Sequence, residues 1–329
     1  MDPRGRLLRP HDRRVKLPEP VSRSTALADG YCDREIQRLC DTGLWQRVKR
    51  GQYVQTARDL SAEQRHKVLT AAVVRTVSAD AVVSHVSAAV LHGLPLWSVS
   101  LAKVHVTRSR KSGGRVGRQV VRHSATLAPS DVVVIDGIRV TSVARTLIDL
   151  GCSIPLASAV IVGDAALRSG LVTRGDLESQ LVSMSQRPGS RAARRMIAAL
   201  DGRSESPGES RSRLLLKDWA VPELQAEVST PQGVTVARVD FLFAQQGVIG
   251  EFDGMVKYRA ELRGGRSAEQ VVIAEKVRED RLRTLGWAVV RWTWAELDNP
   301  RALFARLDHG AAIGASATRV GTWTAPPRL

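Results

Sequence analysis

The chain has 329 residues, of which 43% are hydrophobic and 25% are charged. It contains 49 Lys and Arg against 33 Asp and Glu, which gives a net charge of +16. No run of 18 apolar residues is present to span a membrane, and the basic first 16 residues lack the apolar core of a secretory signal. The three cysteines form no C-x-x-C pair, which disfavours a disulfide framework or a zinc site. These features predict a soluble, cytoplasmic protein that does not contact membranes.

The excess of positive charge favours a polyanionic partner. Nucleic acid ranks ahead of an acidic membrane surface, because contacts to phosphates dominate the affinity of basic proteins for nucleic acids. A chain from an Arg-rich proteome would carry the same excess without binding any polyanion. Charge alone therefore does not decide the function.

The N-terminal part divides into a basic arm and a small folded domain. Residues 1–22 are basic and punctuated by prolines, among them Pro10, Pro18 and Pro20, and are predicted as a flexible arm. Residues 23–56 predict a short helix, a second helix from Asp33 with Ile36 on its apolar stripe, and two strands joined through Lys49-Arg50-Gly51. Helix, turn, helix and basic hairpin is the element order of a winged helix.

Residues 57–204 predict a mixed α/β region followed by helices. SAEQRHKVLTAAVVRTV has the pattern of an amphipathic helix, KVHVTRS and VVVIDGIRVTS of strands, and LASAVIVGDAALRSG, TRGDLESQLVSM and SRAARRMIAALDG of helices. His85 and His92 are seven residues apart and share one face of a predicted helix. No carboxylate or cysteine accompanies them, so packing or capping histidines are expected.

The stretch RSESPGES has the composition of a linker, and a domain boundary is expected there. Residues 205–307 then predict a helix, a three-strand meander, a helix, a strand and a helix, which is the order of a small α/β nuclease core. Residues 308–329 are predicted as a tail. The fold class is therefore α/β (α+β), with an N-terminal winged helix, a mixed α/β middle region and a C-terminal core like that of restriction endonucleases.

Two acids in this last region are predicted to face each other. If VTVARVDFLF and VIGEFD form a hairpin through Ala244-Gln-Gln-Gly247, Phe243 pairs with Val248 and Asp240 lies opposite Glu251. The same register places Arg238 opposite Asp253. Opposed carboxylates repel each other, whereas a divalent cation between them removes the repulsion and supplies a Lewis acid. A three-residue loop would shift the register by one and remove this pairing.

The motifs ESRSRLLL, VDFLF, GEFDGMVKY, EKVREDRLRTLGW and VVRWTW resemble the DUF559 domain of the PD-(D/E)XK superfamily, which shares the fold of very-short-patch repair endonucleases. The resemblance implies that Asp240 and Glu251 hold Mg²⁺ or Mn²⁺, with Glu209 as a further ligand from the leading helix. It also implies a lysine two residues after Glu251 that orients the attacking water. This chain has Asp253 there, which leaves Lys257 and Lys276, on the following helix, as candidate catalytic lysines.

The N-terminal stretches GYCDREIQRLCDTGLWQRVKRGQYV, SHVSAAVLHGL and DGIRVTSVARTLIDL resemble the AbiEi antitoxin group of type IV toxin–antitoxin systems. The resemblance implies a winged helix that binds double-stranded DNA. Arg34, Gln37 and Arg38 would face the major groove, and Lys49 and Arg50 would contact phosphates. These residues are otherwise ordinary solvated charges on a helix and a turn.

Two functions remain open. The first is a Mg²⁺-dependent DNA endonuclease guided to DNA by the winged helix. The second is a non-catalytic transcriptional regulator or AbiEi-type antitoxin, with a nucleotidyltransferase toxin as its partner. The acid pair favours the first function, and the absence of lysine at position 253 favours the second.

Overall fold

The structure is a computed structural model that describes residues 19–55, 60–110, 113–254 and 268–328. Helices and mixed sheets place the chain in the predicted α/β class. The described residues form two compact units, one reaching to Gly93 and including Val99–Ser142, the other comprising Leu94–Ser98 and everything from Val143 onward. None of the described helices is long and apolar enough to cross a lipid bilayer. Of the predicted arm, only residues 19–22 are described.

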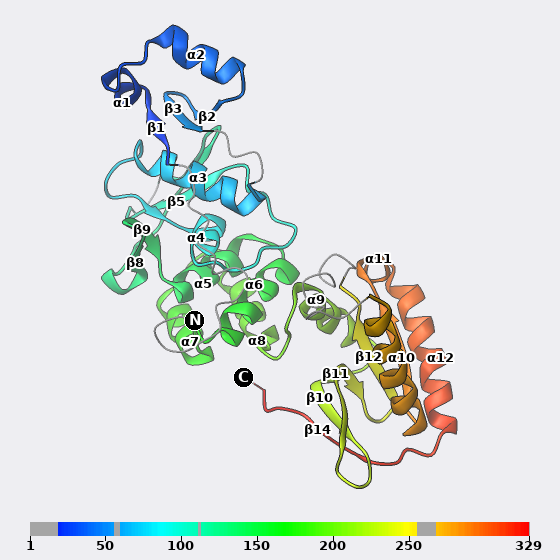
Figure 1. Ribbon diagram of the computed structural model, residues 1–329. Coiled ribbons are helices and arrows are strands. Elements are labelled where there is room, and N and C mark those ends of the chain that lie inside the picture. The colour runs from blue at the N-terminus through cyan, green and yellow to red at the C-terminus, as the bar shows by residue number, and fades with distance from the viewer. Residues whose placement is uncertain (1–18, 56–59, 111–112, 255–267, 329) are drawn as a thin grey trace. The chain divides into compact units, whose positions relative to one another are not determined.

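The first unit begins with the predicted winged-helix order, shown in blue in Figure 1. The elements are β1 Val21–Ser22, α1 Arg23–Ala28, α2 Asp33–Asp41, β2 Trp45–Lys49 and β3 Gln52–Gln55. The strands form an antiparallel sheet in the order β1-β3-β2. Ile36 of α2 is buried with Ala26, Trp45 and Tyr53, so one face of α2 packs inward as predicted and the opposite face is left exposed.

The rest of the first unit is a six-stranded mixed sheet in the order β6-β7-β5-β4-β9-β8. Its elements are α3 Ala62–Val74, β4 Val82–Val83, α4 His85–Leu91, β5 Val104–Arg108, β6 Arg115–Val116, β7 Val120–Ser124, β8 Val132–Ile135 and β9 Ile138–Thr141. The buried valines of β4, β5, β7 and β9 form one core with Val73 of α3 and Ala88 of α4. The strands β6 and β7 were not predicted from the sequence.

The second unit opens with four helices: α5 Val143–Ser153, α6 Leu156–Arg168, α7 Arg174–Ser183 and α8 Ser190–Ala199. The first of these was not predicted as a helix. A buried carboxylate on α6, Asp164, accepts a hydrogen bond of 2.7 Å from Nη2 of Arg213, which lies on the next helix, α9 (Pro207–Leu216). This ion pair fixes the helical layer to the remainder of the unit.

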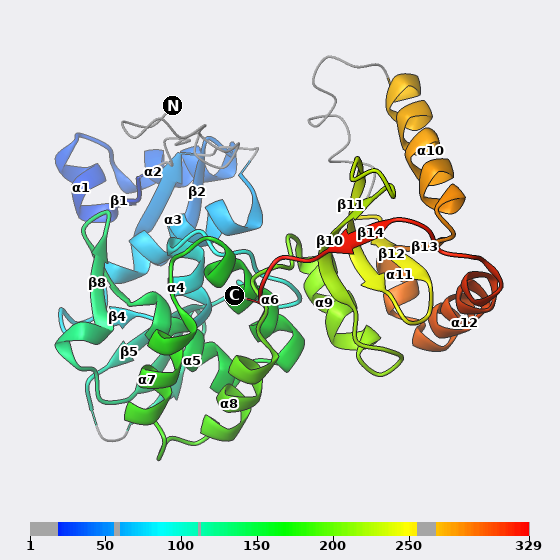
Figure 2. The same ribbon diagram turned by 90° about the horizontal axis from the view of Figure 1, so that it is seen from below.

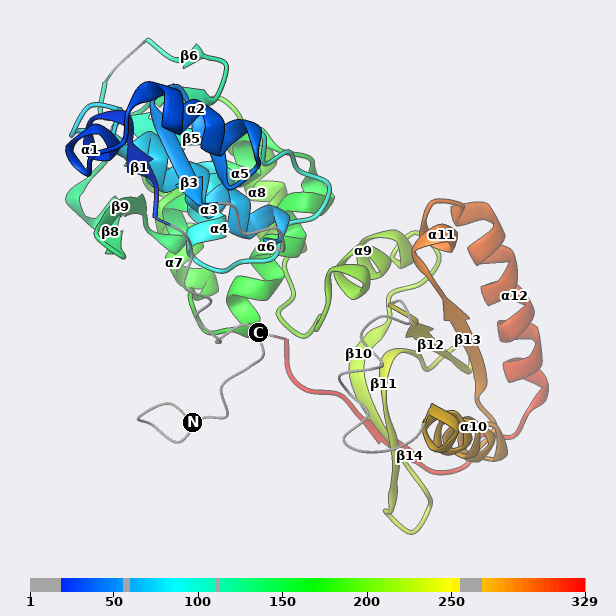
Figure 3. The same cartoon turned by 45° about the horizontal axis from the view of Figure 1, so that its top comes forward.

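The remainder is a five-stranded sheet in the order β13-β12-β11-β10-β14, with helices on both faces (Figure 3). Its elements are α9 Pro207–Leu216, β10 Glu223–Ser229, β11 Thr235–Phe243, β12 Val248–Phe252, α10 Ala268–Thr284, β13 Ala288–Trp292, α11 Trp294–Leu297, α12 Pro300–Ser316 and β14 Thr322–Thr324. One core lies between the sheet and α9, α11 and α12, and a second lies between the sheet and α10. Strands β12 and β13 are parallel, and the other neighbours are antiparallel.

Two segments predicted as irregular are ordered parts of this unit. The predicted linker contains the start of α9, where Ser206 caps the helix, and Ser204 before it is buried. Serine and proline are favoured at a helix N-terminus as well as in linkers, so the composition did not distinguish the two. The predicted tail continues α12 to Ser316 and then adds β14 to the edge of the sheet beside β10 (Figure 2). The composition of both segments predicted loops, whereas helix capping at α9 and strand pairing at the edge of the sheet give them regular structure.

Candidate functional site

Asp240 and Glu251 lie on neighbouring strands in the register predicted from the sequence. Phe243 pairs with Val248 across a four-residue turn that ends at Gly247, whose φ of +69° suits glycine. Phe241 pairs with Gly250, and the register continued by one residue places Asp240 opposite Glu251. The backbone N–H of Phe252 donates a 3.0 Å hydrogen bond to Oδ2 of Asp240. The predicted hairpin register is confirmed.

Glu209 reaches the same place from the first turn of α9. Gly208 permits this approach, since a Cβ at that position would overlap the ring of Phe252 on β12. The Glu209 side chain is buried, and its Oε2 accepts hydrogen bonds from the Glu205 backbone N–H at 2.8 Å and from Gln225 Nε2 at 2.9 Å. A helix N-terminus thereby adds a third carboxylate to the strand pair.

The negative charge of Asp240 disfavours the ionised form of the other two carboxylates. Burial, and then the negative charge of Asp240, raise the pKa of Glu251 to about 7. The same two causes raise the pKa of Glu209, and burial raises the pKa of Asp240. Such a group of acids is costly unless protons or cations neutralise it.

Arg278 of α10 brings a positive charge to these acids. Its Nη1 donates a 3.2 Å hydrogen bond to Oε1 of Glu251, and its Nε donates to Glu275 at 3.0 Å. Lys276, the lysine predicted on this helix, has an exposed side chain. Lys257 lies outside the described residues. The structure therefore brings an arginine to the acid group from the helix on which a lysine was predicted.

Gln225 completes the site and was not predicted from the sequence. It lies on β10 opposite Asp240, between the pairs Leu224–Phe241 and Ala226–Val239, and its φ of +53° is a left-handed conformation unusual for glutamine. This conformation breaks the alternation of the strand, because Leu224 and Ala226 pack into the two different cores. Strained residues of this kind are frequent at functional sites.

Arg238 does not follow the sequence prediction of a pairing with Asp253. Its two Nη groups donate to the carboxylate of Glu205 at 2.7 and 2.9 Å. Among the described residues, one group of three side chains has ligand atoms that all lie within 4.8 Å of one another, and it consists of histidines of the first unit. The carboxylates of Glu209, Asp240 and Glu251 are not that close together. A shared cation would therefore require the acid side chains to move closer together.

The predicted DNA-reading residues of α2 are exposed on the face opposite its buried stripe. Arg34, Gln37 and Arg38 all point away from the core of the winged helix. The Nε2 of Gln37 donates a 2.7 Å hydrogen bond to Asp41, one turn further along α2. This face combines donors and positive charge, which suits contact with a duplex.

The two predicted wing residues differ from each other. Arg50 is exposed, whereas Lys49 is half-buried and its Nζ donates a hydrogen bond to Thr76 Oγ1. Burial, together with the positive charge of Arg122, lowers the pKa of Lys49. A hollow of about 390 Å³ lies beside the wing and is lined by Arg23, Asp33, Ile36, Gln37, Arg47, Arg50, Gly51 and Tyr53. Of its arginines, Arg23 and Arg47 were not predicted from the sequence to contact DNA.

The two histidines expected to pack or cap lie at the two ends of α4. His92 is the C-terminal cap residue of this helix, and its Nε2 lies 2.7 Å from the carbonyl oxygen of Thr141. His85 is buried at the first position of the helix. The expectation of packing or capping histidines is confirmed for both, and His85 also has two further histidines beside it.

No family model matches this chain. Two Mycobacterium tuberculosis proteins, uncharacterized protein MT2308 of strain CDC 1551 and uncharacterized protein Rv2248 of strain H37Rv, are each 30% identical to it over 178 residues. That match covers 54% of this chain and 58% of each relative, so the chain spans less than two thirds of the curated relatives it matches. The solved Rv2827c protein of M. tuberculosis matches 59% of this chain and 75% of its own, with 16% identity and a TM-score of 0.38.

Proposed function

We propose that this protein binds double-stranded DNA through its winged helix and hydrolyses phosphodiester bonds at a divalent-cation site formed by Glu209, Asp240 and Glu251. The observation that carries the proposal is the convergence of these carboxylates, from α9, β11 and β12, beside Arg278 of α10. The element order from α9 to β13 is also the order that the resemblance to the PD-(D/E)XK superfamily implies.

The donor set fits a hard cation. Carboxylate oxygens are the ligands that Mg²⁺ and Mn²⁺ prefer, and Gln225 and the Phe252 N–H hold two of the acids by hydrogen bonds. A bound divalent cation would supply Lewis acidity and lower the pKa of a coordinated water. Asp240 and Glu251 would hold that cation, and Glu209 would add a carboxylate from the helix.

Arg278 supports part of the role that a lysine has in the superfamily. A guanidinium stays protonated at physiological pH, so it can donate to the phosphate and offset developing negative charge, but it cannot accept a proton from water. The proton of the attacking water must therefore pass to a group other than Arg278, such as a carboxylate that does not hold the cation. In this assignment Arg278 binds and orients the phosphate, and the three acids hold the cation.

A DNA-binding regulator of the AbiEi type that does not cut DNA is the second candidate. The ion pair between Arg278 and Glu251, and the exposed position of Lys276, favour this alternative, because they leave the acids with an arginine where the superfamily has a lysine. Its partner would be a nucleotidyltransferase toxin. Both candidates require the winged helix to bind DNA, and they differ in cleavage.

Nicking of a supercoiled plasmid by the purified full chain separates the two. The endonuclease converts the plasmid to the relaxed form with Mg²⁺ or Mn²⁺ and not with EDTA. Asp240→Asn abolishes this activity, whereas Asp218→Asn, at an exposed aspartate after α9, leaves it unchanged. Plasmid that is retarded in a gel but never relaxed, in any metal, would establish the regulator and exclude the endonuclease.

A further inference from the structure

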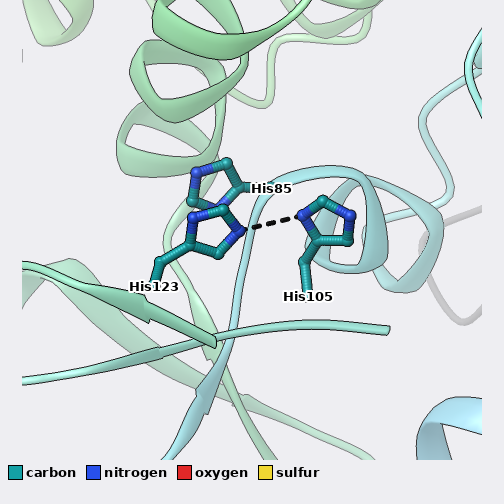
Figure 4. Close-up of side chains that lie close together, drawn as sticks. All are labelled: His85, His105 and His123. Atoms are coloured by element: carbon teal, nitrogen blue, oxygen red, sulfur yellow. Dashed lines mark hydrogen bonds between the residues drawn. The ribbon is translucent and has the colours of Figure 1, made fainter. Parts of the chain in front are cut away.

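Three histidines of the first unit lie together (Figure 4). One ring nitrogen of each of His85, His105 and His123 can serve as a ligand atom, and these atoms all lie within 4.8 Å of one another. His105 Nδ1 is 3.0 Å from His123 Nε2, and the ring of His85 stacks on that of His123 with centroids 3.7 Å apart. His85 is buried, and the other two are half-buried.

The topology of the six-stranded sheet produces this cluster. Strands β5 and β7 are parallel, and the pairs His105–Val121 and Thr107–His123 place the two histidines on adjacent strands, two residues out of register. β4 is the other neighbour of β5, and His85 follows it at the start of α4. The three residues are separated by about 20 positions in the sequence, so no spacing motif indicates them.

His85 is held in place by an unusual backbone. Its φ of +52° is a left-handed conformation that is rare for residues with a side chain and costs on the order of 1 kcal/mol. Ser84 Oγ lies 2.9 Å from His85 Nδ1 and also accepts a 2.8 Å hydrogen bond from Thr107. These contacts orient the ring in the way that metal-bound histidines are oriented by hydrogen bonds to their other nitrogen.

The structure assigns a transition-metal site to His85, His105 and His123, and we propose that it binds Zn²⁺. Three neutral imidazoles suit Zn²⁺ and similar ions, whereas Mg²⁺ prefers oxygen ligands. Tetrahedral coordination at about 2.1 Å needs nitrogens about 3.4 Å apart, so the 3.0 Å pair must open slightly. Three protein ligands leave the fourth position to water or a small ligand.

Binding requires no net loss of protons from the rings. Two neutral imidazoles in the His105 Nδ1–His123 Nε2 contact would share one proton. When Zn²⁺ takes both of these nitrogens, that proton leaves the shared hydrogen bond and the ring that carried it is protonated on its other nitrogen.

Zinc binding by the full chain, freed of metal with a chelator, tests the proposal. We expect about one equivalent of Zn²⁺ per chain at micromolar concentration, with a rise in melting temperature, because a ligand that binds only the folded state stabilises it. Co²⁺ in the same site should give the intense visible absorption of tetrahedral coordination. Wild-type protein that takes up no Zn²⁺ at about ten times the protein concentration overturns the proposal without any variant.

Variants locate the site. His105→Gln and His123→Gln should each weaken Zn²⁺ binding at least tenfold and remove the Co²⁺ absorption. His309→Gln, at an exposed histidine on α12, and Asp240→Asn, in the acid group, should leave both unchanged. Retention of wild-type zinc affinity by His105→Gln and His123→Gln, with both folded by circular dichroism, contradicts the assignment. Loss in Asp240→Asn alone would place the zinc in the acid group and also contradict it.

Discussion

The backbone N–H of Phe252 donates a 3.0 Å hydrogen bond to Oδ2 of Asp240. Phe252 follows Glu251 on β12, so this bond holds the aspartate of β11 beside the strand that carries the glutamate. The two acids therefore stay close whether or not a cation is present, and their repulsion is built into the metal-free protein. The predictions for the acid group follow from that repulsion.

Asp240→Asn should stabilise the metal-free protein. The substitution removes one of the interacting negative charges, and an amide oxygen can still accept the hydrogen bond from Phe252. We expect a gain on the order of 1 kcal/mol in the free energy of unfolding, measured with urea in EDTA. Asp218→Asn is the control, with no change expected. A lower free energy of unfolding in Asp240→Asn would show that the Asp240 carboxylate stabilises the metal-free protein.

The stability of the metal-free protein should fall as pH rises from about 4.5 to about 7. The pKa of Glu251 is about 7 in the folded chain against an ordinary value of 4.5, so the folded state binds more protons than the unfolded state in this window. Raising the pH through this window therefore lowers the free energy of unfolding, and Glu251 accounts for at most about 3 kcal/mol of that loss.

Urea unfolding in EDTA at pH 5 and pH 8 measures this loss. Glu251→Gln should show a smaller loss than wild type, because it removes the titrating group. Glu269→Gln, at an exposed residue of α10, should behave as wild type. Equal pH dependence in wild type and Glu251→Gln would show that Glu251 does not titrate in this range.

The sequence predicted the parts of this site that depend on strand periodicity. Phe243 opposite Val248 followed from the four residues between two alternating strands, and the pairing of Asp240 with Glu251 followed from that register. It could not predict Gln225, because the left-handed backbone that brings its amide to Glu209 depends on tertiary contacts. Nor could helix pattern alone distinguish Arg278 from Lys276, two residues apart on α10.

The winged helix was predicted for a similar reason. The apolar stripe of α2 and the turn at Gly51 are local signals, and the structure has both. The contact of Lys49 with Thr76 is not local, because 27 residues separate the two. Ser204 and Ser206 also show that linker-like composition is shared by helix caps. The local sequence pattern predicted the helices and strands, whereas packing between residues far apart in the sequence determines which polar side chains are exposed.

Arg278→Gln should impair cleavage more than metal binding. The guanidinium contacts Glu251 and Glu275, and its loss removes a donor for the phosphate while also removing a positive charge that opposes cation binding. We expect plasmid nicking to fall at least tenfold while affinity for Mn²⁺ stays the same or rises. Arg283→Gln on the same helix, which removes the ion pair between the exposed Arg283 and Glu279, is the matched control. Full nicking activity in Arg278→Gln would remove this residue from the reaction.

Arg34→Ala combined with Arg38→Ala should weaken binding to duplex DNA, whereas Arg50→Ala should also flatten the dependence of binding on salt. Removing one side chain that neutralises a phosphate should reduce the slope of log affinity against log salt by about 0.9. Lys49→Ala should change the slope less than Arg50→Ala, because Lys49 is half-buried and bonded to Thr76. Fluorescence anisotropy from about 50 to about 300 mM salt measures both effects. An affinity identical to wild type in the double variant would exclude α2 from the interface.

Limited proteolysis should spare residues 203–208 despite their Ser, Pro and Gly content. Ser204 is buried, its carbonyl oxygen accepts a hydrogen bond from Arg168, and Ser206 caps α9. A protease needs an exposed, extensible segment, which these contacts deny. Mass spectrometry of trypsin fragments tests this at Arg203. Early cleavage after Arg203 would show that the segment behaves as the linker its composition suggests.

Calorimetric titration of the full chain with Mn²⁺ tests the proposed acid site most directly. Wild-type protein at pH 8 should bind Mn²⁺ with saturable heat and gain melting temperature as the metal concentration rises. Asp240→Asn should show neither response, whereas Asp218→Asn and His123→Gln should show both. Absence of any saturable heat or thermal shift in the wild type at millimolar Mn²⁺ would contradict a metal-dependent site at Glu209, Asp240 and Glu251.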